Sequence, residues 1–500
     1  MIAGLLWKDR NEQWLSKADS IWEDRFLDLK LEPIVHVMSG GDPCITEVCR
    51  QVLDAPLQTA EEIQYRQEIL KDCLRDSRTI ETVYEICSEA ERKRKSTWCR
   101  LTSPHLTTVY SSAQDLLKIY LEALVAIRKS LEKAEFHSQG LQQLSKLLTT
   151  ELSDAYLEQL RELQPGIESK NGIEISAGFG PYLQGVSYVK RQPDQKRARL
   201  RWLLQPSYTL GDRDMKGAKD LELREDRAIH EVANVMAQAA ESLQSLVDQL
   251  RKELSFYLGG IHLWETLKAG PKRLCFPELT DGNNRSYTGL YDGTLVLAGH
   301  ENIVPNTLQS VDHRLWLITG ANQGGKTTFL RSIGLCQLMA QCGLFVFAEA
   351  CRIPVRQQIF THFVREEDRS LSSGKLEEEL CRMDAIVERI QPNAMLLSNE
   401  SFSSTNDRDG SEIFLGIVRG LLSGGIEIFA VTHLIEFADT IARRQDVLSL
   451  RPGRTETGER TYQLQEAKPI PDAYAEDIYR EIFGADEGPK TSAKTGRKPQ

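Results

Sequence analysis

The nine residues Gly320-Ala-Asn-Gln-Gly-Gly-Lys-Thr-Thr328 have the types and spacing needed to hold a chain of phosphates. They fit the phosphate-binding loop pattern G-x-x-x-x-G-K-[ST] at every fixed position. Glycine carries no Cβ, so the backbone at such a loop can wrap an anion and turn its N–H groups towards it. Lys326 supplies a positive charge for the terminal phosphates, and the hydroxyl of Thr327 is placed to ligate Mg²⁺. The stretch therefore predicts an ATP–Mg²⁺ site made by Gly320, Ala321, Asn322, Gln323, Gly324, Gly325, Lys326, Thr327 and Thr328.

Two later stretches carry the residues that hydrolysis of a nucleotide would need. The apolar run Ala394–Asn399 ends at Glu400, a candidate to orient or deprotonate the attacking water. Asn399 stands where an aspartate would normally support the metal shell, and it keeps an oxygen acceptor without the charge. The run Glu427–Thr432 ends at His433, a candidate sensor of the terminal phosphate or a capping or core histidine.

The flanks of the glycine-rich loop indicate the elements that position it. The apolar run Arg314–Thr319 predicts a buried parallel strand, and Phe329–Leu344 predicts a helix whose N-terminus faces the phosphates. A segment around Ser373 and Gly374 precedes another helix start and is similar to the signature element of ABC-type ATPases. In those proteins the element completes the site of the partner subunit, so its presence predicts a dimer.

Composition sets outer bounds on the class of protein. A chain of 500 residues with 41% hydrophobic content can bury large cores and is long enough for two to four domains. There is no apolar run of about 18 residues or more and no signal-peptide pattern, so we expect no membrane segment and a cytoplasmic location. The ten cysteines lack C-x-x-C spacing and are expected to be reduced. A net charge of −10 excludes wholesale coating of nucleic acid but not a local basic contact.

The first half of the chain reads as helical. Thr59 and Glu62 form a capping box, and the basic run Arg92–Lys95 is interpreted as a solvated helix face. Two amphipathic stripes predict long helices that form two antiparallel arms, the second about 50 Å long. The pair Ser103-Pro104 predicts the start of the first of these helices. The apolar positions of the two stripes are Ala113, Leu117, Tyr120, Leu124, Ile127 and Leu131, then Val232, Met236, Ala239, Leu243, Leu246, Leu250 and Leu254.

A glycine-, proline- and tyrosine-containing region between the stripes predicts a hairpin with strands at 185–190 and 198–203 and a basic tip. Six cations with Tyr188 and Trp202 interleaved are suited to gripping a nucleic-acid backbone. A soluble hairpin whose turn happens to be basic is an equal alternative. The candidate DNA contacts are Lys190, Arg191, Lys196, Arg197, Arg199 and Arg201.

With these residues in view, the chain resembles the MutS family of DNA mismatch-repair ATPases, and in particular its shorter members without the mismatch-reading domain. The likeness is strongest over 281–451, where the loop, Ile359-Phe-Thr-His362, Glu400 and Val431-Thr-His433 follow in family order. A weaker likeness covers the N-terminal half.

The departures from the family pattern affect the site. Ile303 stands where many members have an aromatic residue that stacks on adenine, Asn399 replaces the usual aspartate, and Ser401-Phe-Ser-Ser-Thr405 replaces a more glycine-rich loop. The resemblance still implies nucleotide contact at Ile303 and metal contact at Thr327 and Asn399.

Together these observations predict a mixed fold in which an all-α core and lever carry a small β-containing clamp-like tip and are followed by an α/β P-loop ATPase domain of ABC type. The expected divisions are 1–104 helical core, 105–172 first lever arm, 173–225 basic clamp-like insertion, 226–270 second lever arm, 271–485 ATPase and 486–500 disordered tail.

The function that the resemblance implies is a homodimeric, ATP-switched DNA-binding clamp acting in mismatch repair or related DNA repair and recombination, with Glu400, His433 and Lys326 catalytic. The alternative is a nucleotide-binding scaffold whose hydrolysis is vestigial because of Asn399. A transporter ATPase subunit fits poorly, because the long arms are unexplained and no transporter signature precedes Glu400.

Overall fold

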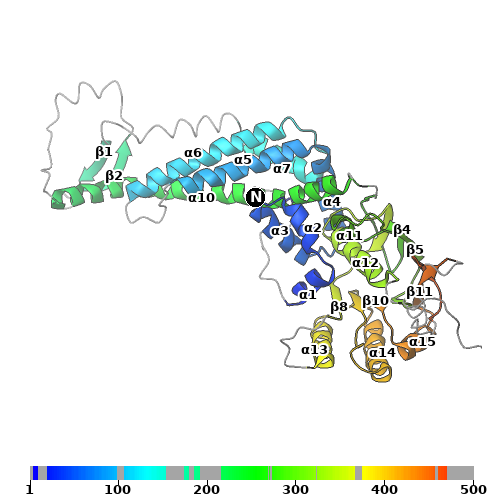
Figure 1. The fold of residues 1–500 in the computed structure, drawn as a ribbon. Coiled ribbons are helices and arrows are strands. Elements are labelled where there is room, and N and C mark those ends of the chain that lie inside the picture. The colour runs from blue at the N-terminus through cyan, green and yellow to red at the C-terminus, as the bar shows by residue number, and fades with distance from the viewer. Residues whose placement is uncertain are drawn as a thin grey trace, which may run out of the picture.

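The computed structural model describes residues 4–8, 20–97, 106–151, 153, 174–179, 185–191, 215–268, 270, 273–321, 324–365, 374–455 and 460–469. Within these ranges the chain is a mixed α and β protein with a helical part, a small hairpin and an α/β part that holds two larger sheets (Figure 1). The end of one long helix joins the helical part to the α/β part.

Short helices come first in the helical part. They are α1 (Ser20–Asp28), α2 (Glu32–Ser39), α3 (Pro43–Asp54), α4 (Ala60–Arg75), α5 (Ser77–Ser96), α6 (Leu106–Leu131) and α7 (Gln139–Glu151). The helix start at Thr59 is confirmed, because Thr59 Oγ1 accepts the Glu62 N–H. The Glu62 carboxylate accepts from the Thr59 hydroxyl and not from its backbone N–H, so the capping box is formed only in part. All six apolar positions of the first predicted stripe are buried on α6.

The long helix α10 (Met215–Lys268) has 54 residues and therefore reaches about 80 Å. It begins earlier than the sequence indicates, within the range assigned to the clamp-like insertion, because the apolar stripe that guides such a prediction starts only near Val232. Helices α5 and α6 lie along it (Figure 1).

The directions of these helices correct the expectation of two antiparallel arms. Tyr110 of α6 packs against Ala233, and Tyr120 of α6 lies near Arg94 of α5, which also lies near Asp248. Residue numbers on α6 and α10 therefore rise together, so these two helices are parallel. The antiparallel partner of α10 is α5, because Tyr84 of α5 lies near Ser255 whereas Arg94, later in α5, lies near Asp248. Helices α5 and α6 therefore form an antiparallel hairpin. Apolar periodicity identifies the buried face of a helix but not its direction.

At the far end of α10 lies a two-stranded antiparallel hairpin of β1 (Glu174–Phe179) and β2 (Gly185–Arg191). The predicted strand at 185–190 is confirmed. The second predicted strand, 198–203, and the helix start at Ser103-Pro104 lie outside the described residues.

The α/β part is built on a six-stranded sheet ordered β12-β11-β6-β10-β9-β8, parallel except for the edge strand β12. Alternate residues along each strand enter different cores, as a pleated strand requires. On β6, Trp316 and Ile318 pack towards α12, and Leu315 and Leu317 pack towards α13, α14 and α15. The strands are β6 (Leu315–Ile318), β8 (Ile359–Phe363), β9 (Met395–Asn399), β10 (Glu427–Val431), β11 (Val447–Arg454) and β12 (Arg460–Glu466), and the helices are α12 (Lys326–Gln341), α13 (Lys375–Val387), α14 (Asp407–Ser423) and α15 (Ile435–Ile441).

A second sheet of four strands, ordered β3-β7-β4-β5, is joined to the first by buried charges. Arg285 donates to both carboxylate oxygens of Glu427, and Arg356 donates to one of them at 2.8 Å. Each buried charge is thereby paired, which offsets the cost of removing it from water. The strands are β3 (Glu278–Thr280), β4 (Arg285–Leu290), β5 (Asn306–Ser310) and β7 (Ala350–Pro354), with the short helix α11 (Gly293–Leu297) following β4.

The helical part and the α/β part share one hydrophobic core that includes residues of α2–α7, α10 and α12. Adjacent glycines let α10 enter it closely: a Cβ on Gly259 would lie 2.7 Å from Cys49 Sγ, and one on Gly260 would lie 2.9 Å from Leu70. The fully buried Arg66 adds polar links by donating to the carbonyls of Leu6 and Cys342.

The basic run of α5 is neutralised locally. Arg92 pairs with Glu85 and Glu89, and Arg94 and Lys95 pair with Glu91. This arrangement fits the solvated helix face that the sequence indicates. Among the described helices, none is both long enough and apolar enough to cross a bilayer.

Substitution of Gly259 by valine tests the close approach at the inner end of α10. We expect it to lower the free energy of unfolding by about 1–3 kcal/mol, because the added atoms overpack a filled core. The matched control is Gly416→Ala on α14, where a Cβ meets open space, and this change should stabilise by up to about 1 kcal/mol. Urea denaturation of both variants measures the difference, and equal effects would contradict the packing described.

Candidate functional site

The predicted phosphate loop leaves the carboxyl end of β6 and enters α12. Gly320 and Gly325 have φ of +126° and +84°, values that favour glycine. A Cβ on Gly320 or Gly324 would lie within 2.9 Å of Pro452 on β11, so the backbone turns in a space that no other residue fits. Asn322 and Gln323 lie outside the described residues.

Lys326 lies at the centre of the loop and is buried. Its Nζ donates to the carbonyls of Gly320 at 2.7 Å and Ala321 at 2.8 Å. Desolvation lowers the pKa of Lys326 to about 8, although the nearby Glu400 carboxylate acts in the opposite direction. The ammonium is therefore hydrogen-bonded to two neutral carbonyl oxygens and has only the nearby Glu400 as an opposite charge, so a polyanion bound beside it would stabilise its charged form further.

Glu400 and His433 come together at the ends of β9 and β10. His433 Nε2 lies 3.1 Å from Glu400 Oε1 and 3.3 Å from Lys326 Nζ. The hydrogen bond from His433 is the largest cause that lowers the pKa of Glu400, and Lys326 contributes in the same direction. The structure thus joins the three residues that sequence analysis predicts to be catalytic.

The backbone around Glu400 is strained. Glu400 has φ of +57° and Phe402 has φ of +62°, and neither residue is a glycine. Such conformations cost about 1–3 kcal/mol each and persist where surrounding contacts hold them. The Glu400 N–H donates to Val431 O at 2.8 Å, which ties the turn to the neighbouring strand.

Thr327 and Asn399, the predicted metal contacts, are also adjacent. Thr327 Oγ1 donates to Asn399 Oδ1 at 3.0 Å. Both atoms are neutral oxygens, which suit a hard cation such as Mg²⁺ that keeps most of its water shell. The pair fits a magnesium ion carried by a nucleotide, with less negative charge than a carboxylate would provide.

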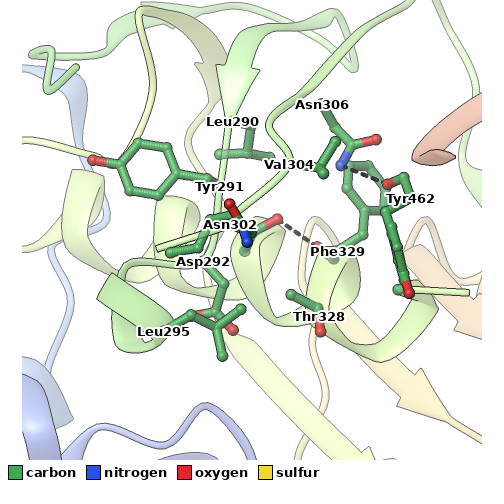
Figure 2. A pocket seen from close by; sticks show the side chains of 13 residues that line it. Leu290, Tyr291, Asp292, Leu295, Asn302, Val304, Asn306, Thr328, Phe329 and Tyr462 are labelled. Carbon is green, nitrogen blue, oxygen red and sulfur yellow. Dashed lines mark hydrogen bonds between the residues drawn. The ribbon is translucent and has the colours of Figure 1, made fainter. Parts of the chain in front are cut away.

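Beside the loop lies a cavity of about 300 Å³ (Figure 2). Ile303, Thr328 and Gly325 line it, which places the predicted base contact next to the phosphate loop. Tyr462 of β12 forms part of the wall, and its backbone is pinned by Asn306, whose Nδ2 donates to Tyr462 O at 3.5 Å and whose Oδ1 accepts the Leu464 N–H at 2.7 Å. The cavity therefore adjoins the loop, because Gly325 and Thr328 belong to both.

The remaining predicted residues lie apart from this recess or outside the description. Gly374 caps the N-terminus of α13 with open space around it, whereas Ser373 lies outside the described residues. The backbones of Lys190 and Arg191 are in β2 at the far hairpin. Lys196, Arg197, Arg199 and Arg201 lie outside the described residues, so their role in DNA binding stays a prediction.

Sequence analysis missed residues that only the fold brings to the site. Tyr462 is distant in sequence and follows no motif, and Asn306 lies in no motif that assigns it a role. His362 lies in a segment that resembles the family, Ser401 lies in one that departs from it, and neither segment assigns a role to these residues; Glu379 follows no motif. No spacing rule connects these positions, because they meet through strand neighbours.

Two models of known families match the chain. The MutS2 N-terminal domain matches residues 58–270, and MutS domain V matches residues 316–469. The first match covers α4 to α10, and the second covers the loop, Glu400 and His433. One match falls in the helical part and the other in the α/β part, while α1–α3 and the segment from β3 to β5 lie outside both.

The chain thus belongs to the MutS family. It is 24% identical over 452 residues to an endonuclease MutS2 of Halalkalibacterium halodurans, covering 90% of this chain and 49% of that protein. It is 26% identical over 328 residues to an endonuclease MutS2 of Shouchella clausii, covering 65% and 38% of the two chains. A DNA mismatch repair protein MutS of Fervidobacterium nodosum is 24% identical over 384 residues, covering 74% and 45%. The chain spans half or less of the length of these relatives.

The environment of Lys326 predicts a measurable titration. We expect the ε-amine to lose its proton with a midpoint near pH 8, and Glu400→Gln to move that midpoint lower, because removing the carboxylate charge removes the factor that raises the pKa of Lys326. The pH dependence of acylation of Lys326, followed by mass spectrometry, measures both midpoints. A midpoint near 10.5 in the parent would contradict the burial of this side chain.

Proposed function

We propose that this protein is an ATP-dependent DNA-binding protein of the MutS type that acts in DNA repair or recombination. The observation that carries the proposal is the convergence of Lys326, Glu400 and His433 at the carboxyl ends of adjacent parallel strands. Membership of the MutS family supports it, and so do relatives that bear the names endonuclease MutS2 and DNA mismatch repair protein MutS.

In this proposal the phosphates of ATP lie on the loop 320–328. Lys326 exchanges its carbonyl partners for phosphate oxygens, and binding at alkaline pH is accompanied by proton uptake because the pKa of Lys326 rises. Thr327 and Asn399 would hold Mg²⁺, which would neutralise phosphate charge when bound. Glu400 orients or deprotonates the attacking water, and His433 senses the terminal phosphate.

The base occupies the cavity beside the loop. Ile303 offers an aliphatic wall, and Tyr462 supplies an aromatic side chain on β12, in a chain that has no aromatic residue at position 303. An apolar recess with few polar groups is typical of a nucleobase site.

The proposal retains the domain divisions of the sequence analysis and places DNA at the basic hairpin, at the far end of α10. Ser373 and Gly374 complete the nucleotide site of a second copy, which makes the acting unit a homodimer. ATP binding then changes DNA affinity only if contacts differ between the nucleotide states.

ATP hydrolysis is tested by substituting Glu400 and Lys326. Glu400→Gln should lower kcat for ATP by about 100-fold or more with little change in nucleotide affinity, since it removes the general base. Lys326→Ala should weaken ATP binding about tenfold or more, since it removes a charged hydrogen-bond donor. Glu412→Gln is the control, because Glu412 is exposed on α14. Phosphate release and fluorescent-nucleotide titration give the two quantities.

The scaffold alternative predicts a different pattern. A scaffold should still bind nucleotide, and Lys326→Ala should weaken that binding. Its ATP turnover should be the same in the parent protein, Lys326→Ala and Glu400→Gln. Asn399→Asp tests the metal contact independently of this choice, because restored carboxylate charge should strengthen the Mg²⁺ dependence of nucleotide binding whichever alternative holds.

DNA binding is tested on matched, mismatched and branched duplexes with and without ATP. We expect an affinity that changes with nucleotide and that falls about tenfold or more in the double variant Arg197→Ala, Arg199→Ala, with a shallower salt dependence because phosphate contacts are lost. The control is Arg92→Ala, Lys95→Ala on α5, where acidic neighbours already pair the cations. Absent or nucleotide-independent binding would contradict the proposal.

A further inference from the structure

The turn that carries Glu400 is held in a left-handed conformation by side chains and not by glycine. Glu400 and Phe402 both have positive φ, and the loop 401–405 contains no glycine. Glycine would adopt this backbone freely, so its absence means that other groups must fix the turn. Those groups lie directly beneath it, on β8, β9 and α13.

Ser401 is the first of these groups. Its Oγ lies 2.6 Å from Ser398 Oγ and 2.6 Å from His362 Nδ1, and all three residues are buried. The hydroxyl therefore fixes the residue that follows Glu400 to two adjacent strands of the sheet.

His362 continues the chain of hydrogen bonds to α13. Its Nε2 lies 3.0 Å from the backbone carbonyl of Glu379, so this nitrogen must carry the proton and donate it. Nδ1 is then an acceptor, and the Ser401 hydroxyl donates a hydrogen bond to it. Burial lowers the pKa of His362 to about 4, with Arg382 contributing, so the ring stays neutral and keeps this one arrangement at physiological pH.

The side chain of Glu379 on α13 bonds directly to the turn. Its side chain is buried, and Oε2 accepts the N–H of Phe402. The Phe402 ring stacks on His362 with centroids 5.7 Å apart and packs against Phe414. The turn 400–402 is thus attached twice to Glu379 of α13, once through His362 to the backbone carbonyl and once directly to the side chain.

We propose that Glu379, together with the His362–Ser401 pair, positions Glu400 for catalysis, and that α13 thereby controls the placement of the general base. The inference rests on the proposed ATPase function and deepens it. Helix α13 begins at Lys375, immediately after Gly374, the element proposed to meet the nucleotide of a partner copy. The same helix therefore connects the partner's site to the base of this one.

If these residues only position Glu400, their removal should leave the nucleotide-binding site intact, whereas removal of a residue with a general structural role should disturb it. None of the three side chains contacts the loop 320–328 in the hydrogen bonds of the described residues. Their loss should displace Glu400 while the phosphate and base recess keeps its shape. The signature is a fall in kcat with an unchanged nucleotide affinity, because small misplacement of a catalytic group is costly to rate.

The test compares Glu379→Ala, Glu379→Gln and the control Asp384→Ala, an exposed acidic residue of the same helix. We expect Glu379→Ala to lower kcat about tenfold or more with the Kd for ATP within about twofold of the parent. Glu379→Gln retains an oxygen acceptor for the Phe402 N–H and should keep kcat within about threefold. Asp384→Ala should behave as the parent does.

The outcomes separate the inference from the function beneath it. If Glu400→Gln is inactive while Glu379→Ala turns over like the parent, or loses rate and affinity together, the inference is overturned. If the parent and Glu400→Gln turn over alike, the ATPase proposal fails and the inference falls with it. Should Glu379→Ala not fold, Ser401→Ala removes only a hydroxyl; kcat lowered several-fold at unchanged Kd supports the inference, and parental kcat overturns it.

Discussion

The packing of α12 is the constraint on which the rest of the structure depends. Its first residue, Lys326, lies at the centre of the glycine-rich loop, and every later residue except Thr327 and Thr328 is buried. Gly334 sits where a Cβ would lie 2.6 Å from both Leu29 of the helical part and Leu397 of β9. Gln341 at the other end donates to Leu57 O. The helix cannot shift without disturbing the sheet and the helical part together.

Buried charged groups also link α12 to its neighbouring elements. Arg331 of α12 pairs with Asp292, which lines the cavity, and also donates to the carbonyl of Asp28 on α1. Asp28 lies near Arg382 of α13, and burial raises its pKa to about 6. Ionic groups removed from water are costly to separate, so these contacts favour concerted movement of the elements over independent movement.

The sequence predicts those parts of this protein whose structure follows from a local pattern, such as motif spacing or apolar periodicity. The loop, the strand before it, the strands ending at Asn399 and Val431, and the apolar face of α6 follow from glycine placement and periodicity. The relative direction of the helices and the contacts between residues distant in sequence do not follow from such patterns. Whether α6 runs parallel to α10 depends on the hairpin that it forms with α5, and Tyr462 reaches the cavity because β12 pairs with β11 at the edge of the sheet.

The same limit applies to the surroundings of Glu400. The sequence names the acidic residue but cannot reveal that Phe402 adopts positive φ, because a buried ring, a serine, a histidine and a carboxylate from other elements impose that conformation. Local propensity for Phe402 favours the opposite sign of φ, and tertiary contacts override it.

Because α10 is long, a small rotation at its closely packed inner end, at Gly259 and Gly260, moves its other end over a large distance. Met215 lies 44 residues from Gly259, which corresponds to about 66 Å of helix. A rotation of about 5° at the two glycines would sweep the far end through about 6 Å, more than the rise of one helical turn. Displacements too small to disturb the core around α12 are thus magnified at the distant hairpin to the scale of a molecular contact made or broken.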